Sequence, residues 1–119
     1  MSSVSSTQSA SAFSAAELKA QTTLDNGPGA HRIGLIALAS DYVVERDFMN
    51  MRPGDEVAVF VSRVLNVNPC TVENLKTMGP RLADAASLII PDGRLDAMVY
   101  CCPSGTAAMG YDTVAENIR

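Results

Sequence analysis

The residues with the clearest chemical potential lie in the segment LDAMVYCCPSGT, residues 95–106. Its apolar first half predicts a buried strand, and two adjacent cysteines then lead into a loop of small polar residues. Ligands of open α/β folds bind at the carboxyl ends of parallel strands, so this pattern places a thiol where chemistry occurs. A thiolate there can act as base or nucleophile, and we single out Cys102 because it is the cysteine nearer the expected loop.

A structural role for the cysteines is the alternative. Neighbouring strand residues face opposite sides, so only one of the pair can face the site, and we expect Cys101 to pack. Cys102 can also be a packing residue. Judged by spacing alone, a small residue filling the top of the core is the favoured interpretation, because free cysteine is among the most buried residue types. Cys70 precedes a predicted helix and is expected to be structural. No C-x-x-C or Cys/His spacing predicts a metal site.

Polar residues after the predicted strands are candidates for substrate binding. Ser104, Gly105 and Thr106 follow Cys102 and offer N–H and hydroxyl donors to an anion. Ser40 and Asp41 follow the apolar run 33–39 and should emerge at the same edge, where they either contact a ligand or cap the next helix.

Two further residues bear on the mechanism. Arg63 leaves the predicted strand 57–61 at that edge, where it either pairs with a substrate carboxylate or is an ordinary surface arginine. His31 is the sole histidine and adjoins the N-terminal leader. A Cys–His catalytic pair is therefore not expected.

Apolar patterning predicts how these residues are positioned. Continuous apolar runs predict strands at 33–39, 57–61 and 95–101, and helical spacing predicts helices between them. The alternation favours an α/β fold in which a parallel sheet is flanked by helices and joined by right-handed crossovers. We expect residues 1–30, rich in Ser and Ala, to be a flexible leader and residues 31–119 to form one α/β domain.

The C-terminal end predicts an incomplete domain. Residues 113–119 read as the opening turns of a helix without a C-terminal stop, and three strands leave sheet edges exposed. We therefore expect either a homo-oligomer or a missing C-terminal half.

Composition narrows the class of protein. Of the 119 residues, 47% are hydrophobic and 18% charged, as is usual for a globular domain, and the net charge of −4 with scattered Lys and Arg argues against nucleic-acid binding. No apolar run predicts a membrane span, and no signal-peptide pattern is present. Three cysteines are a poor disulfide framework, so we expect a cytoplasmic protein.

Taken together, residues 32–41, 59–63 and 95–105 resemble the aspartate/glutamate racemase superfamily, in the branch of maleate cis-trans isomerase and arylmalonate decarboxylase. Residues 40–48, 52–56 and 73–80 are most similar to the ectoine-utilisation proteins of that branch. The resemblance implies the flavodoxin-like first half of a pseudo-twofold fold, with an active site between two halves. It also implies a cofactor-independent mechanism in which each half can contribute one cysteine.

By this resemblance, Cys102 matches the first-half cysteine of a Cys-Thr-Ser-Gly motif, and Asp41 matches a substrate-binding asparagine. Pro103 departs from the motif and removes a hydroxyl and an N–H that could serve an oxyanion. Asp41 in place of asparagine would repel a carboxylate unless it is protonated or paired. No residue of this chain stands in for the second-half cysteine.

The sequence thus predicts one half of a cysteine-dependent isomerase or racemase of a small carboxylate, in ectoine degradation or maleate-type isomerisation. This chain alone would be inactive. Two alternatives stay open. One is an arylmalonate-type decarboxylase, in which Cys102 would be dispensable, and the other is a non-catalytic binding or interaction half-domain.

Overall fold

The computed structural model describes residues 21, 23, 25 and 27–119. Most of the leader expected at residues 1–30 therefore lies outside the described residues. Within the described part, three strands and five helices follow one another in the order β1-α1-β2-α2-α3-β3-α4-α5.

A parallel three-stranded sheet forms the centre of the domain. It consists of β1 (His31–Leu38), β2 (Val57–Val64) and β3 (Ala97–Tyr100), in the order β2-β1-β3. The central strand pairs on both sides, Ile33 being opposite Val59 on β2 and Ala97 on β3. Its middle residues are fully buried, which explains the unbroken apolar run in the sequence. The predicted α/β arrangement with a parallel sheet is confirmed.

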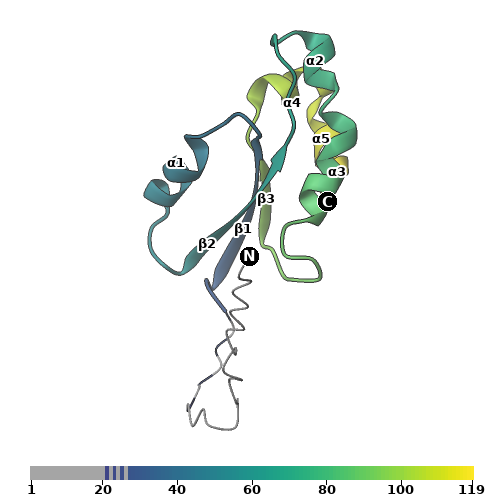
Figure 1. The fold of residues 1–119 in the computed structure, drawn as a ribbon. Coiled ribbons are helices and arrows are strands. Elements are labelled where there is room, and N and C mark those ends of the chain that lie inside the picture. The colour runs from purple at the N-terminus through teal and green to yellow at the C-terminus, as the bar shows by residue number, and fades with distance from the viewer. Residues whose placement is uncertain (1–20, 22, 24, 26) are drawn as a thin grey trace, which may run out of the picture.

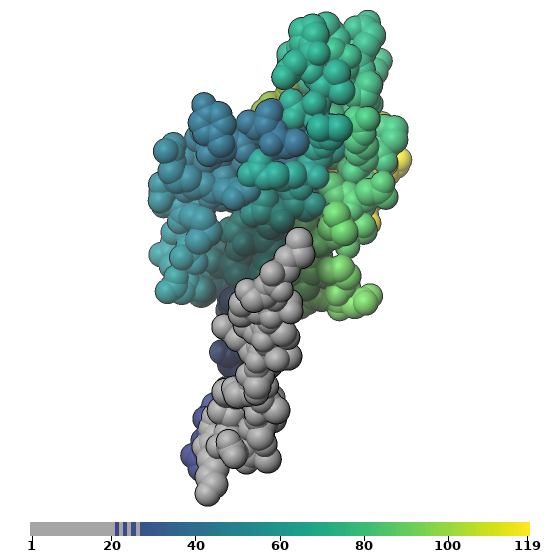
Figure 2. All heavy atoms as spheres, viewed as in Figure 1, coloured from purple at the N-terminus to yellow at the C-terminus, as the bar shows by residue number. Residues whose placement is uncertain are grey.

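Helices cover the two faces of this sheet unequally (Figure 1). One face carries only α1 (Val44–Met51), whereas α2 (Val72–Lys76), α3 (Gly79–Ser87), α4 (Pro103–Met109) and α5 (Tyr111–Asn117) lie together on the other. In the space-filling view, α1 and its connections form a separate lobe beside the sheet (Figure 2).

Local signals set the helix boundaries on the more heavily covered face. The Thr71 hydroxyl accepts a hydrogen bond from the Asn74 N–H at 3.2 Å, so Thr71 is the N-cap of α2. Pro80 lies in the first turn of α3, where a missing N–H costs no hydrogen bond. The stripe Leu82, Ala85 and Ile89 then faces inward.

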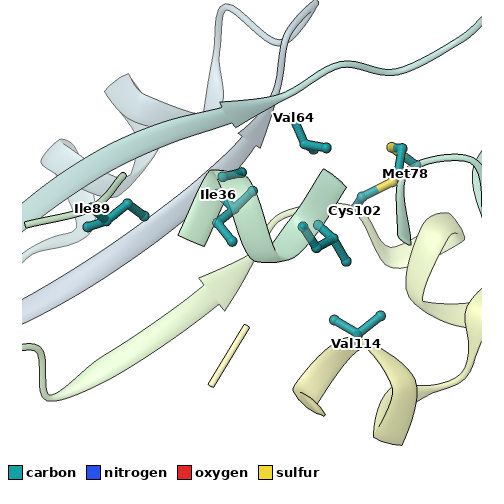
Figure 3. Close-up of a cluster of buried hydrophobic side chains, with 8 residues drawn as sticks. Ile36, Val64, Met78, Ile89, Cys102 and Val114 are labelled. Atoms are coloured by element: carbon teal, nitrogen blue, oxygen red, sulfur yellow. The ribbon is translucent and has the colours of Figure 1, made fainter. Parts of the chain in front are cut away.

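The main hydrophobic core lies between the sheet and the group α2–α5 (Figure 3). Both Ile36 of β1 and Leu82 of α3 have 0% of their surface exposed. The other buried residues of the cluster are Val64, Met78, Ala85, Ile89, Cys102 and Val114.

One expectation from the sequence is wrong. Residues 104–106 do not form a loop, because α4 begins at Pro103 and takes them into its first turn. Proline is favoured at such a position, since its φ angle suits a helix and its missing N–H would be unpaired there anyway. The loss of an N–H at residue 103 therefore removes a group that the helix does not use.

Candidate functional site

Cys102 connects β3 to α4 and is the N-cap residue of that helix. Its sulfur accepts a hydrogen bond from the Gly105 N–H at 3.3 Å, and the Ser104 hydroxyl lies 3.6 Å from it. The residue is 3% exposed and belongs to the main core. Cys102 is thus both a capping group and a core residue.

The three residues after Pro103 form part of the first turn of α4, next to Cys102. Thr106 directs its N–H and its hydroxyl to the Cys102 carbonyl oxygen, each at 3.0 Å. Gly105 is buried and Ser104 is exposed. Of the donors predicted for an anion, the Gly105 N–H is engaged with the Cys102 sulfur, and the Thr106 N–H and hydroxyl are engaged with the Cys102 carbonyl oxygen.

The expectation that Cys101 packs while Cys102 faces the site is wrong, because Cys102 lies in the core and Cys101 is the less buried of the two. It is half-buried, and its pKa is raised by burial, then by the negative charge of Asp41 and by Cys102. Because β1 and β3 are parallel neighbours, the loop after β1 and the end of β3 lie at the same carboxyl edge of the sheet. Cys70 is exposed.

Asp41 precedes Val43, the N-cap residue of α1, and its side chain binds N–H groups at the start of that helix. Its Oδ1 accepts hydrogen bonds from the N–H groups of Val43 at 2.8 Å and Val44 at 3.0 Å. These bonds, with the charge of Arg63, hold the pKa of the carboxyl below its usual value although partial desolvation raises it. The capping role considered from the sequence is therefore realised, and the carboxylate is ionised at neutral pH.

Ser40 is paired with a residue that the sequence did not single out. The N–H and the hydroxyl of Ser40 both donate to Asn66 Oδ1, at 3.3 and 3.1 Å. Asn66 follows β2, so its polar side chain directly after an apolar strand was the available signal.

Arg63 fastens the same loop to the sheet. Its guanidinium donates to the carbonyl oxygens of Leu38, at 2.9 Å, and Asp41, and it forms an ion pair with Glu45. These contacts already engage both terminal nitrogens of the guanidinium. Arg63 accordingly orders the loop between β1 and α1.

A groove of about 490 Å³ runs beside β3, on the side away from β1. Tyr100 and Thr106 line its wall near Cys102, and Tyr111, Ile118 and Arg119 of the C-terminal region complete it. Tyr100 and Thr106, which line this groove, both lie close to Cys102.

The described residues contain no group of three or more His, Cys, Asp and Glu side chains able to hold a metal ion. In the same part of the chain, no helix has the length and apolar character needed to span a bilayer.

Comparison with known proteins found no matching family model, no similar curated protein and no similar solved structure.

Proposed function

We propose that this chain contributes one active-site thiol, Cys102, to a cofactor-independent isomerase or racemase of a small carboxylate. The domain would correspond to one half of the pseudo-twofold fold of the aspartate/glutamate racemase superfamily. A second thiol, from another domain or chain, would complete the acid–base pair. Maleate-type isomerisation and a step in ectoine degradation are the reactions that the sequence resemblance favours.

The hydrogen bond from the Gly105 N–H to the Cys102 sulfur is the observation that supports this role most directly. A backbone donor aimed at sulfur stabilises the thiolate more than the thiol, because bonds to charged acceptors are stronger. The exposed Ser104 hydroxyl is the nearby group able to contact a substrate anion. Asp41 and Ser40 would contribute from the loop after β1 at the same carboxyl edge, their side chains being held by α1 and Asn66.

The 3% exposure of Cys102 favours a second candidate, a non-catalytic binding or interaction half-domain. In that case the sulfur serves as a helix cap and a core atom. A decarboxylase that relies on the other half's cysteine would leave Cys102 in the same position.

Addition of maleate tests the first step without the second thiol. Attack by the Cys102 thiolate forms a C–S bond at one alkene carbon, and the resulting carbanion takes a proton from water. The adduct retains every atom of maleate and is located by peptide mass spectrometry. We expect the adduct on Cys102 and its loss in Cys102→Ser.

The exposed Cys70 and the half-buried Cys101 are internal controls for ordinary thiol reactivity. Maleate on Cys70 alone, with Cys102 unmodified in the folded chain, would overturn the catalytic proposal in favour of the core role.

A further inference from the structure

Tyr100 and Cys102 converge on one point above Gly105. A β-carbon added to Gly105 would lie 2.7 Å from the Tyr100 hydroxyl oxygen and 3.0 Å from the Cys102 sulfur. Met78 reaches the same point, with its methyl carbon 3.1 Å away. Only a residue without a side chain leaves room for these three groups, so the absence of a β-carbon at position 105 creates the cluster.

The Tyr100 hydroxyl donates to the Met78 sulfur at 3.3 Å. A thioether is a weak acceptor, so this bond is easily exchanged for a better one. Figure 3 shows the Cys102 side chain directed toward Met78 within the core. The hydroxyl thus has a weak partner while a potential thiolate lies beside it.

We propose that Tyr100 is a positioning residue whose hydroxyl turns from the Met78 sulfur to the Cys102 sulfur when that thiol loses its proton. This inference rests on the proposed function, since it is the mechanism that gives Cys102 a thiolate form. Together with the Gly105 N–H, the hydroxyl provides the thiolate with two donors from two different elements.

The number of available protons explains why the Tyr100 hydroxyl would change its acceptor. In the neutral state the Cys102 S–H is itself a donor, and the single hydroxyl proton of Tyr100 is used on Met78. Once the thiol proton passes to water, sulfur becomes a charged acceptor and attracts the hydroxyl proton more strongly than the thioether does. The Gly105 N–H stays on the Cys102 sulfur throughout.

The surroundings keep the hydroxyl protonated while Cys102 titrates. Burial raises the pKa of Tyr100 far above its usual value, and the interaction with Cys102 raises it further. Cys101 is a further titratable group that interacts with Cys102. From α3 and α5 the core cluster receives apolar side chains, Leu82 and Val114. Among the described residues, no polar or charged side chain is buried there.

The experiment is a titration of Cys102 in the full chain by the ¹³Cβ chemical shift of labelled cysteine. Cys70→Ser and Cys101→Ser leave one thiol to observe. We expect Tyr100→Phe to leave about 10-fold less Cys102 thiolate at a given pH. Met78→Leu should leave more thiolate, because the hydroxyl loses its competing acceptor.

Tyr111→Phe is the matched control, because this exposed tyrosine lines the same groove without a contact to Cys102. If Tyr100 had a purely structural role, the titration midpoints of Cys102 in Tyr100→Phe and Met78→Leu would not shift in opposite directions. An unchanged or lowered midpoint in Tyr100→Phe overturns the inference. If that variant does not fold, the near-isosteric Met78→Leu decides alone, and a raised or unchanged midpoint there overturns it.

The titration contains no substrate, so its outcome is separable from that of the proposed function. Opposite shifts together with no maleate adduct on Cys102 would retain Tyr100 as a thiolate donor and reject the isomerase chemistry. A maleate adduct on Cys102 with no shift in Tyr100→Phe would do the reverse.

Discussion

The two faces of the sheet differ in how firmly they are packed. On the α2–α5 face, eight buried residues form a continuous core that includes Cys102. On the other face α1 buries none of its own residues, and a cavity of about 250 Å³ remains between it and the sheet. The two adjacent cysteines differ in burial in the same way. Cys102 lies in the core, whereas Cys101 is half-buried and is influenced by the charge of Asp41. The chemical environment of a thiol at this edge is therefore set by the face to which it belongs.

Truncating one apolar side chain on each face should reveal the largest difference. Leu82→Ala removes a fully buried side chain of α3 and should lower the free energy of unfolding by about 2–5 kcal/mol. Met49→Ala on α1, where the residue is 45% exposed, should cost less than about 1 kcal/mol. Urea unfolding followed by circular dichroism measures both. Equal losses would show that α1 packs as firmly as α3.

Adding a methyl group to each face sharpens the comparison from the opposite direction. Gly105→Ala forces a β-carbon against Tyr100 and the Cys102 sulfur, so we expect a loss of about 1–3 kcal/mol in unfolding free energy. Val59→Ile extends a side chain that lines the cavity under α1 and should be neutral or slightly stabilising. The same urea experiment applies. A neutral Gly105→Ala would mean that the cluster around Cys102 has free space.

Much of the fold was predictable because its signals are local. The apolar run of β1 needs no tertiary information to be identified as a buried central strand, and neither does the Thr71 cap of α2. The first turn of α4 was missed because Ser104, Gly105 and Thr106 are residues typical of loops. What makes them helical is Pro103 at the first position and the hydrogen bonds back to Cys102.

The candidate site was predictable in position but not in detail. Placing Cys102, Ser40 and Asp41 at one sheet edge follows from the strand order alone. The sequence offers a core position for Cys102 as the alternative to a catalytic one, but it does not decide between the two, because that depends on which face of β3 the helices cover. Nor does it reveal the pairing of Ser40 with Asn66, which joins segments 26 residues apart.

Asp41 provides the smallest test, on the more open side of the carboxyl edge. Its folded-state pKa is lowered, first of all by the N–H groups of Val43 and Val44. A carboxyl with a depressed pKa stabilises the fold fully above its unfolded pKa, and that contribution disappears as the pH falls through the folded value. Acidification below about pH 4, the usual pKa range of aspartate, should therefore lower the stability of the wild type. Asp41→Asn has no charged carboxylate at this position and should not show this loss.

The measurement is the urea midpoint of both proteins between neutral pH and about pH 3, a range that spans the usual aspartate pKa. The difference between wild type and Asp41→Asn should shrink with acid, because the protonated aspartic acid and the asparagine are both uncharged. Leu82→Ala is the control, since its loss comes from apolar burial and should not depend on pH in this way. A constant gap between wild type and Asp41→Asn would mean that the cap acts by its geometry rather than its charge. The loop between β1 and α1 would then owe its order mainly to Arg63, which holds the Leu38 and Asp41 carbonyl oxygens at any of these pH values.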